Sequence, residues 1–221
     1  MNNDLKKMKN IIPILIILLI VSCNKDEPTE AYYNFRDNDF NKLLDIELNS
    51  IIKYENQYGD EIVYEVTESS DQYKKQVTQG SWVLPGSIGY FYYDEKKIEL
   101  ISNSDNYKIK YNFIRYPVNV EQAIEDDLTE YPSEFNGSVF MFLWNGLGDF
   151  KNINIDYERE KVDMLINGIN YQNIIIFQSN NPEPIINNPV PEKNVNVIYY
   201  DTFYGIVGFD DLNDNHWRIV N

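Results

Sequence analysis

The side chains that most often carry enzyme chemistry are scarce in this chain. Among 221 residues there is a single cysteine, Cys23, and a single histidine, His216. A Ser-His-Asp triad would have to use His216, and a zinc site normally needs three protein ligands drawn from His, Cys and carboxylate. A lone cysteine also leaves no internal disulfide. We therefore expect no catalytic residues, no metal and no cofactor, and we expect His216 to be an ordinary strand residue beside Trp217.

Two short segments come close to functional motifs. Pro85-Gly86-Ser87-Ile88-Gly89 approaches the nucleophile elbow of serine hydrolases, but Pro85 stands where the first glycine is needed. Asp211 to Asn215 has the Asp-x-Asn-x-Asn spacing of a calcium loop, but His216 replaces the glycine at position six and no glutamate follows at position twelve. We interpret the second segment as a polar hairpin loop. The many other carboxylates offer pairs for an acidic hydrolase, but the sequence singles out none of them.

Clustered aromatic residues are the remaining candidates for ligand binding. The candidates are Tyr90, Tyr92 and Tyr93 in one segment and Tyr199 and Tyr200 in another. Their rings could stack on sugars. Because successive side chains of a strand point to opposite faces, we expect at least half of these aromatics to lie in the core.

The charge of the chain argues against nucleic acid as a partner. The formal net charge is −16, and removal of residues 1–22 takes away three lysines and one aspartate, which leaves 16 basic and 34 acidic residues, or −18. Such a surface repels phosphate backbones, and it also repels anionic lipid head groups. Attachment to a membrane would therefore have to come from covalent lipid.

The elements that position these residues are predicted to be strands. Residues 51–55 and 61–67 flank a turn with Gly59, residues 72–78 form a further strand, and 88–93 and 98–102 flank a turn at Asp94-Glu95-Lys96-Lys97. Residues 107–113 alternate between apolar and polar, which is typical of a strand with one wet face. Later strands are expected at 161–180 around the Asn167-Gly168 turn, at 195–200, at 205–209 and at 216–220. Residues 37–50 fit either a helical stripe or strand alternation.

Two segments are apolar on both sides and should be covered on both faces. They are residues 139–144 and 174–177, and we expect them to be central strands. Val120, Ile124 and Leu128 are spaced by four, which predicts one short helix at about 120–130. The predicted fold class is mainly β: a curved antiparallel sheet, a sandwich or a half-barrel, with that one helix.

The first residues indicate export. Lys6, Lys7 and Lys9 precede an apolar run from Ile11 to Val21, which as a helix would be about 16 Å long at roughly 1.5 Å per residue. The hydrocarbon core of a bilayer is about 30 Å thick, so the run is typical of a signal peptide rather than a membrane span. It ends in Ile20-Val21-Ser22-Cys23, which resembles the bacterial lipobox. That resemblance implies cleavage before Cys23, a thioether-linked lipid on its sulfur and acylation of its new amino group.

The residues after Cys23 carry a second resemblance. Lys25, Asp26 and Glu27 are similar to the short export tag of Bacteroidota surface lipoproteins; the alternatives are a plain polar tether and retention on a periplasmic leaflet. Residues 164–176, and residues 199–207 followed by Trp217, resemble segments of small Bacteroidota lipoproteins of unknown function, which imply no activity. A weaker similarity is to periplasmic lipoprotein carriers with a half-barrel lined for acyl chains.

These observations predict three parts: a signal peptide at 1–22, the lipidated Cys23 with a polar tether to 36, and a single β-rich domain at 37–221. The expected function is a non-enzymatic binding or interaction module, lipid-anchored at the outer membrane and displayed on the cell surface. Its partners would be the membrane, through the lipid on Cys23, and a protein, glycan or lipid ligand. A half-barrel carrier of a hydrophobic ligand and an acidic hydrolase remain the alternatives.

Overall fold

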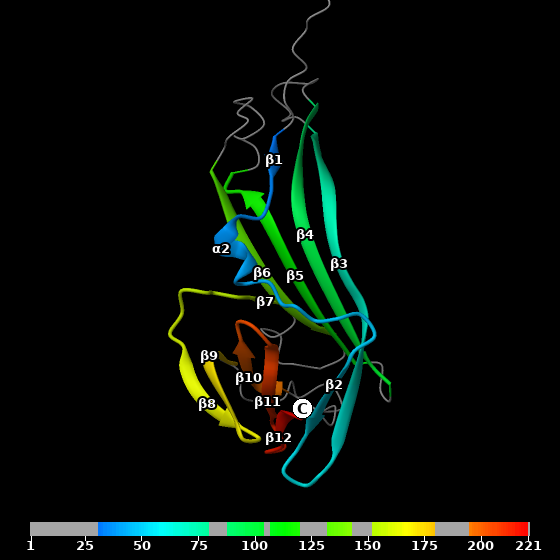
Figure 1. Ribbon diagram of the computed structural model, residues 1–221, viewed down its shortest axis with the longest axis vertical. Coiled ribbons are helices and arrows are strands. Elements are labelled where there is room, and N and C mark those ends of the chain that lie inside the picture. The colour runs from blue at the N-terminus through cyan, green and yellow to red at the C-terminus, as the bar shows by residue number, and fades with distance from the viewer. Residues whose placement is uncertain are drawn as a thin grey trace, which may run out of the picture.

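One curved antiparallel sheet makes up most of the protein (Figure 1). The computed structural model describes residues 31–79, 88–103, 107–119, 132–142, 152–179 and 195–220. The strands are β1 (Tyr32–Tyr33), β2 (Ile51–Glu55), β3 (Glu61–Gln79), β4 (Ile88–Ser102), β5 (Lys108–Pro117), β6 (Ser133–Phe142), β7 (Ile153–Asn154), β8 (Val162–Ile166), β9 (Ile169–Gln178), β10 (Val195–Asp201), β11 (Gly205–Asp211) and β12 (His216–Val220). Their order is β7-β6-β5-β4-β3-β2-β12-β11-β10-β9-β8, and β1 pairs with β4 in parallel.

The sheet curls into a half-barrel, so that its two ends pack against each other through their inner faces. The core contains Tyr111 of β5, Phe177 of β9 and Tyr200 of β10, all of them buried. The hydroxyl of Tyr111 accepts a hydrogen bond from the backbone N–H of Ile206 in β11 at 3.1 Å. This bond joins strands that lie far apart in the sheet order, and the predicted mainly β fold with a curved antiparallel sheet is confirmed.

Strands β3 and β4 are unusually long and project beyond the barrel at the upper end in Figure 1. They pair from Tyr64 with Ser102 to Gln79 with Ile88, without a turn at residues 94–97. The predicted hairpin at Asp94-Glu95-Lys96-Lys97 is therefore wrong, and so is the break between residues 67 and 72. β1 pairs with Tyr92 and Tyr93 at this end of β4, where β5 no longer pairs with it.

The chain after β1 crosses the concave face and includes a single helical turn, α2 (Asp37–Phe40). Arg115 of β5 and Asp39 of α2 form an ion pair of 2.7 Å in which both side chains are only 6% exposed. Asp39 also accepts a hydrogen bond from the backbone N–H of Arg36 at 2.8 Å. Farther along, Ser69 of β3 donates to the carbonyl of Ile46 at 2.7 Å. These contacts hold the segment 34–50 across the half-barrel, and of its ambiguous residues only α2 is helical.

The apolar segment of β9 is covered on both faces, whereas in β6 Val139 and Met141 are buried, Phe140 is only partly buried, and residues 143–144 lie outside the described part. Neither segment is central. β6 and β9 are each the last but one strand in the sheet order, and the middle is occupied by β2 and β12. Ile175 and Phe177 of β9 face the main core, while Ile174 belongs to a second cluster with Ile166, Tyr171 and Val207. The Asn167-Gly168 turn, in which both φ angles are positive (47° and 83°), reaches Ile219 of β12 through a 2.7 Å hydrogen bond.

The folded part begins earlier than predicted. Tyr33 and Phe35 are buried, so residues 32–35 belong to the sheet and core rather than to a tether that ends at residue 36. The signal peptide, Cys23, Lys25, Asp26, Glu27 and the helix expected at about 120–130 lie outside the described residues. Within the part of the chain that the structure describes, no helix is long and apolar enough to cross a membrane.

Candidate functional site

A pocket of about 510 Å³ lies between the crossing segment and the concave face of β3 and β4. It is lined by Phe35, Phe40, Leu43, Leu44 and Asp45 from that segment, by Asp71, Gln72 and Tyr73 from β3, and by Asp94, Glu95 and Lys96 from β4. A volume of this order is in the usual range for small-molecule sites. The pocket is therefore the candidate binding site.

The residues at the floor of the pocket are held in place by burial and by hydrogen bonds. Leu44 is fully buried and Phe35 nearly so. The carboxylate of Asp94 accepts a hydrogen bond from the backbone N–H of Phe35 at 2.8 Å and another from the hydroxyl of Tyr32. Burial of Tyr32, and then this bond to Asp94, raises the pKa of the tyrosine to about 12, so its hydroxyl stays protonated and remains a donor. Asp94 thus holds residues 32–35 against the wall of the pocket that β4 forms.

The walls carry more negative than positive charge. Asp45, Asp71 and Asp94 line the pocket, and Lys96 is the one cation among the lining residues. The Nζ of Lys96 lies 3.7 Å from a carboxylate oxygen of Asp71. Glu95 adds a fourth carboxylate to the lining, and its charge is balanced by Lys97 at 3.2 Å and by Lys74 at 3.9 Å.

Aromatic rings form the rim. Phe40 and Tyr73 are exposed at the mouth, and the Tyr73 ring stacks on Tyr92 with a centroid distance of 4.7 Å and an interplanar angle of 10°. Tyr32 meets Tyr73 edge to face at 5.1 Å. A rim of rings above a wall of carboxylates suits a ligand that has an apolar face and hydroxyl or ammonium donors.

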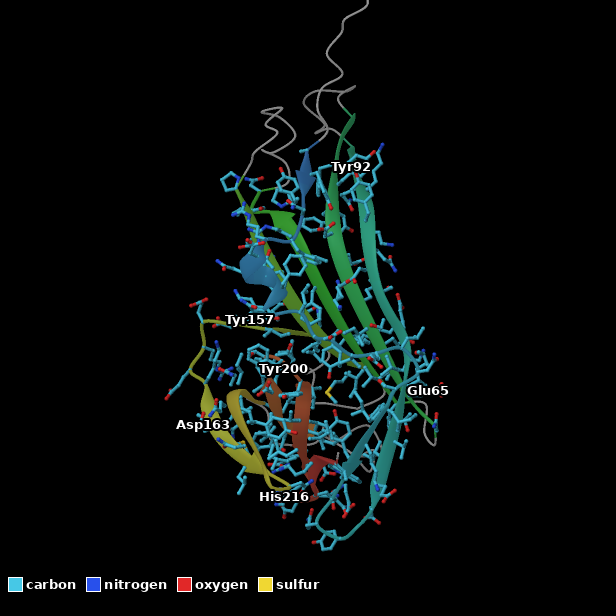
Figure 2. All side chains as sticks on the ribbon, viewed as in Figure 1. Glu65, Tyr92, Tyr157, Asp163, Tyr200 and His216 are labelled. Atoms are coloured by element: carbon cyan, nitrogen blue, oxygen red, sulfur yellow. The ribbon has the colours of Figure 1, made fainter. Side chains whose placement is uncertain are left out.

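The structure divides the first predicted tyrosine group between the two faces of β4. Tyr92 lies beside the pocket rim near the upper end of the molecule (Figure 2). Tyr93 lies on the convex face, where its ring contacts Tyr116 of β5 at 4.6 Å. Burial, and then the hydrogen bond with Tyr116, raises the pKa of Tyr93 far above its usual value. Tyr90 pairs with Val77 in the ladder of β3 and β4, and its side chain lies outside the described part.

The second predicted tyrosine group is divided in the same way. Tyr200 is fully buried in the centre of the molecule and belongs to the core (Figure 2). Tyr199 lies on the outer face, where the guanidinium of Arg218 covers its ring at 4.6 Å and its hydroxyl donates to Asp210 at 2.7 Å. Neither ring is free to form a flat platform for a sugar.

Asp210 is the centre of a polar cluster at the lower end of the molecule. Besides Tyr199, it binds Arg218 at 2.7 Å and the Nδ1 of His216 at 3.1 Å. Burial alone would raise the pKa of Asp210, but the bonds from Arg218 and Tyr199 outweigh it and lower that pKa below its ordinary value. His216 is the first residue of β12, next to Trp217, as predicted.

The loop that resembles a calcium site is held by its own hydrogen bonds. The Asp211 carboxylate accepts from the backbone N–H groups of Asn213 and Asn215, at 2.9 and 3.1 Å, and from the indole N–H of Trp217 at 3.2 Å. This agrees with the interpretation as a polar hairpin loop. No cluster of three or more His, Cys, Asp or Glu side chains within the described ranges could hold a metal ion.

Sequence reasoning missed the pocket because its walls come from three separated segments without a common motif. The sequence offers one sign of the pocket, the charged residues Asp94 and Lys96 between strand-forming residues. The pattern of four successive charged residues predicts a turn instead. The comparisons offer no relative that would assign the site: no protein-family profile matches the chain, and neither the curated proteins nor the solved structures contain a match.

Proposed function

We propose that this chain is a non-enzymatic binding module, anchored by lipid on Cys23 in the bacterial cell envelope, with the pocket of β3 and β4 as its ligand site. The observation that carries the proposal is the pocket itself, in which exposed rings of Phe40 and Tyr73 stand above a surplus of carboxylates. The leader and the lipobox-like residues before Cys23 support the anchor.

The ligand class that fits best is a glycan. A sugar has an apolar ring face for the aromatic rim and several hydroxyls that can donate to Asp45 and Asp71. An amino sugar would also be attracted by the net negative charge of the walls. Lys96 supplies a donor for a sugar oxygen, which a purely cationic ligand could not use.

The packing of the half-barrel supports this module over a lipid carrier. A carrier would need an empty apolar space beneath β6 and β9. In the described residues, Val139 and Met141 of β6 and Ile175 and Phe177 of β9 are buried in the same side-chain cluster. The pocket lies elsewhere, and its apolar side chains are accompanied by the carboxylates of Asp45, Asp71 and Asp94.

The pocket can be tested with an oligosaccharide array probed by the purified chain carrying Cys23→Ala. Phe40→Ala and Asp45→Asn should each weaken binding of any sugar that the unsubstituted pocket retains, by roughly fivefold or more, which is the loss expected when a contact worth over about 1 kcal/mol is removed. Tyr58→Ala, at the far β2–β3 turn, is the matched control with an exposed ring. Equal binding by all variants would place the sugar outside this pocket.

The anchor is tested separately by metabolic labelling with a clickable fatty acid. Cys23→Ala should abolish the label, because no other thiol in the chain can receive the diacylglycerol. Label retained in that variant would exclude Cys23 as the site of lipidation.

A further inference from the structure

The charged side chains that line the pocket do not balance one another. Its carboxylates are those of Asp45, Asp71, Asp94 and Glu95, and the one cation among the lining residues is Lys96. Glu95 is balanced by two lysines that do not line the pocket, at 3.2 and 3.9 Å, and Lys96 lies 3.7 Å from a carboxylate oxygen of Asp71. In the part of the chain that the structure describes, Asp45 and Asp94 form no ion pair with a lysine, arginine or histidine. The pocket therefore keeps two uncompensated carboxylates.

Asp94 is held by neutral groups, which orient its carboxylate without cancelling its charge. One oxygen accepts a hydrogen bond from the hydroxyl of Tyr32, and the other accepts one from the backbone N–H of Phe35 at 2.8 Å. An ionised carboxylate can accept about four hydrogen bonds, so Asp94 can still accept from a ligand. Because its side chain is already fixed, a bound ligand loses little entropy in ordering it.

The other groups of the pocket also suit a cation. Asp45 lies on the crossing segment and Asp94 on β4, so a ligand in the pocket meets a carboxylate on either wall. The ring of Phe40 at the mouth is 58% exposed, and the face of such a ring attracts an ammonium group. The side chain of Lys96, by contrast, is only 14% exposed and lies beside Asp71, so it offers little to an anionic ligand.

We propose that the ligand of this pocket carries a free, protonated amino group, and that Asp45 and Asp94 select such an amino sugar over its neutral N-acetylated counterpart. An ammonium group brings a positive charge and three donors to carboxylates that only accept. N-acetylation removes the charge and leaves an amide with a single donor. This inference rests on the proposed glycan site, and it names the chemical group by which that site chooses among sugars.

The test compares two sugars that differ only in their N-acetyl groups. The trimer of glucosamine and the trimer of N-acetylglucosamine are titrated by calorimetry into the purified chain carrying Cys23→Ala. At low salt the glucosamine trimer should bind roughly tenfold more tightly, and the preference should shrink as added salt screens the charges. Equal affinities, or tighter binding of the acetylated trimer, would overturn the inference.

A matched pair of carboxylate variants separates the pocket from the overall negative charge of the chain. Asp45→Asn removes a charge from the pocket, and Glu47→Gln removes one from an exposed residue of the same segment that does not line it. Asp45→Asn should weaken binding of the glucosamine trimer by roughly fivefold or more, and that of the acetylated trimer less. Glu47→Gln should change neither affinity. An equal loss in both variants would assign the attraction to net charge alone, which also overturns the inference.

Phe40→Ala distinguishes failure of this inference from failure of the glycan site. If it weakens both trimers and the unsubstituted pocket binds them equally, the pocket is a sugar site that ignores the amino group, and the inference alone is wrong. The same holds if neither trimer binds while the oligosaccharide array identifies a neutral sugar. If Phe40→Ala changes neither affinity, the sugars bind outside the pocket, and the proposed site and the inference fail together.

Discussion

At the scale of single residues, the buried ion pair between Asp39 and Arg115 is the most sensitive point. Both side chains are almost excluded from water, and Asp39 also holds the N-terminus of α2. Asp39→Ala leaves a buried guanidinium without its partner, which usually costs about 3–5 kcal/mol. We expect a large drop in the urea midpoint, measured by circular dichroism. Asp37→Ala, an exposed neighbour in the same helical turn, should have little effect. Similar midpoints for both variants would contradict this role of the pair.

Asp210 should give the lower end of the sheet a characteristic dependence on pH. Its pKa in the folded protein lies below its ordinary value, because the bonds from Arg218 and Tyr199 outweigh the effect of burial. A carboxylate with a lowered pKa stabilises the fold above the unfolded pKa of about 3.9, and this contribution is lost as the pH falls through the folded value. The stability difference between the wild type and Asp210→Asn should therefore shrink as the pH falls below about 4. A difference that persists at the lowest pH values would contradict this assignment.

At the scale of elements, closure of the half-barrel depends on a bond between β5 and β11. Tyr111→Phe removes the acceptor of the buried Ile206 N–H, and an unsatisfied buried donor costs about 1–3 kcal/mol. We expect a matching fall in the free energy of unfolding and faster hydrogen exchange at Ile206. Tyr58→Phe, on an exposed turn, is the control. An unchanged exchange rate at Ile206 would show that the bond does not close the barrel.

The elements that the sequence predicts well are those with clear turns. Asn167-Gly168 and Gly59 mark two hairpins, because positive φ angles at such positions leave few alternatives. β12 is also found with its predicted bounds. β4 was divided in error because four charged residues in succession are typical of a turn. In a strand with two polar faces, however, Asp94 and Glu95 find partners on opposite sides.

The prediction that residues 139–144 and 174–177 form central strands is wrong for a physical reason. A doubly apolar strand needs cover on both faces, but that cover does not have to come from a central place in the sheet. β9 lies near one end, and the second cluster around Tyr171 and Val207 covers the face that the core does not. The pocket could not be predicted either, because curvature brings Phe40 and Leu43 over Asp71 and Asp94, and no local pattern encodes curvature.

At the scale of the whole molecule, the proposed export tag determines on which side of the membrane the domain is displayed. If Lys25, Asp26 and Glu27 act as that tag, protease added to intact cells should remove the domain. Replacing all three residues with alanine should protect it. Immunoblots of both cultures, with a periplasmic protein as the control for intact membranes, measure the difference. Equal cleavage of the two versions would argue against a tag at these positions.

The middle of the sheet is a junction between early and late parts of the chain. β2 pairs with β12 from Lys53 with Val220 to Glu55 with Arg218, so more than 160 residues separate the partners. Contacts of such long sequence separation form slowly, because the entropy of closing the loop is lost before the pairing compensates for it. A ribosome-bound or nicked chain that lacks β12 would hold two partial sheets, each with an unpaired edge at β2 or β11. Exposed edges of this kind recruit other strands, so the period before β12 docks is when the protein is most prone to aggregate and most in need of a chaperone.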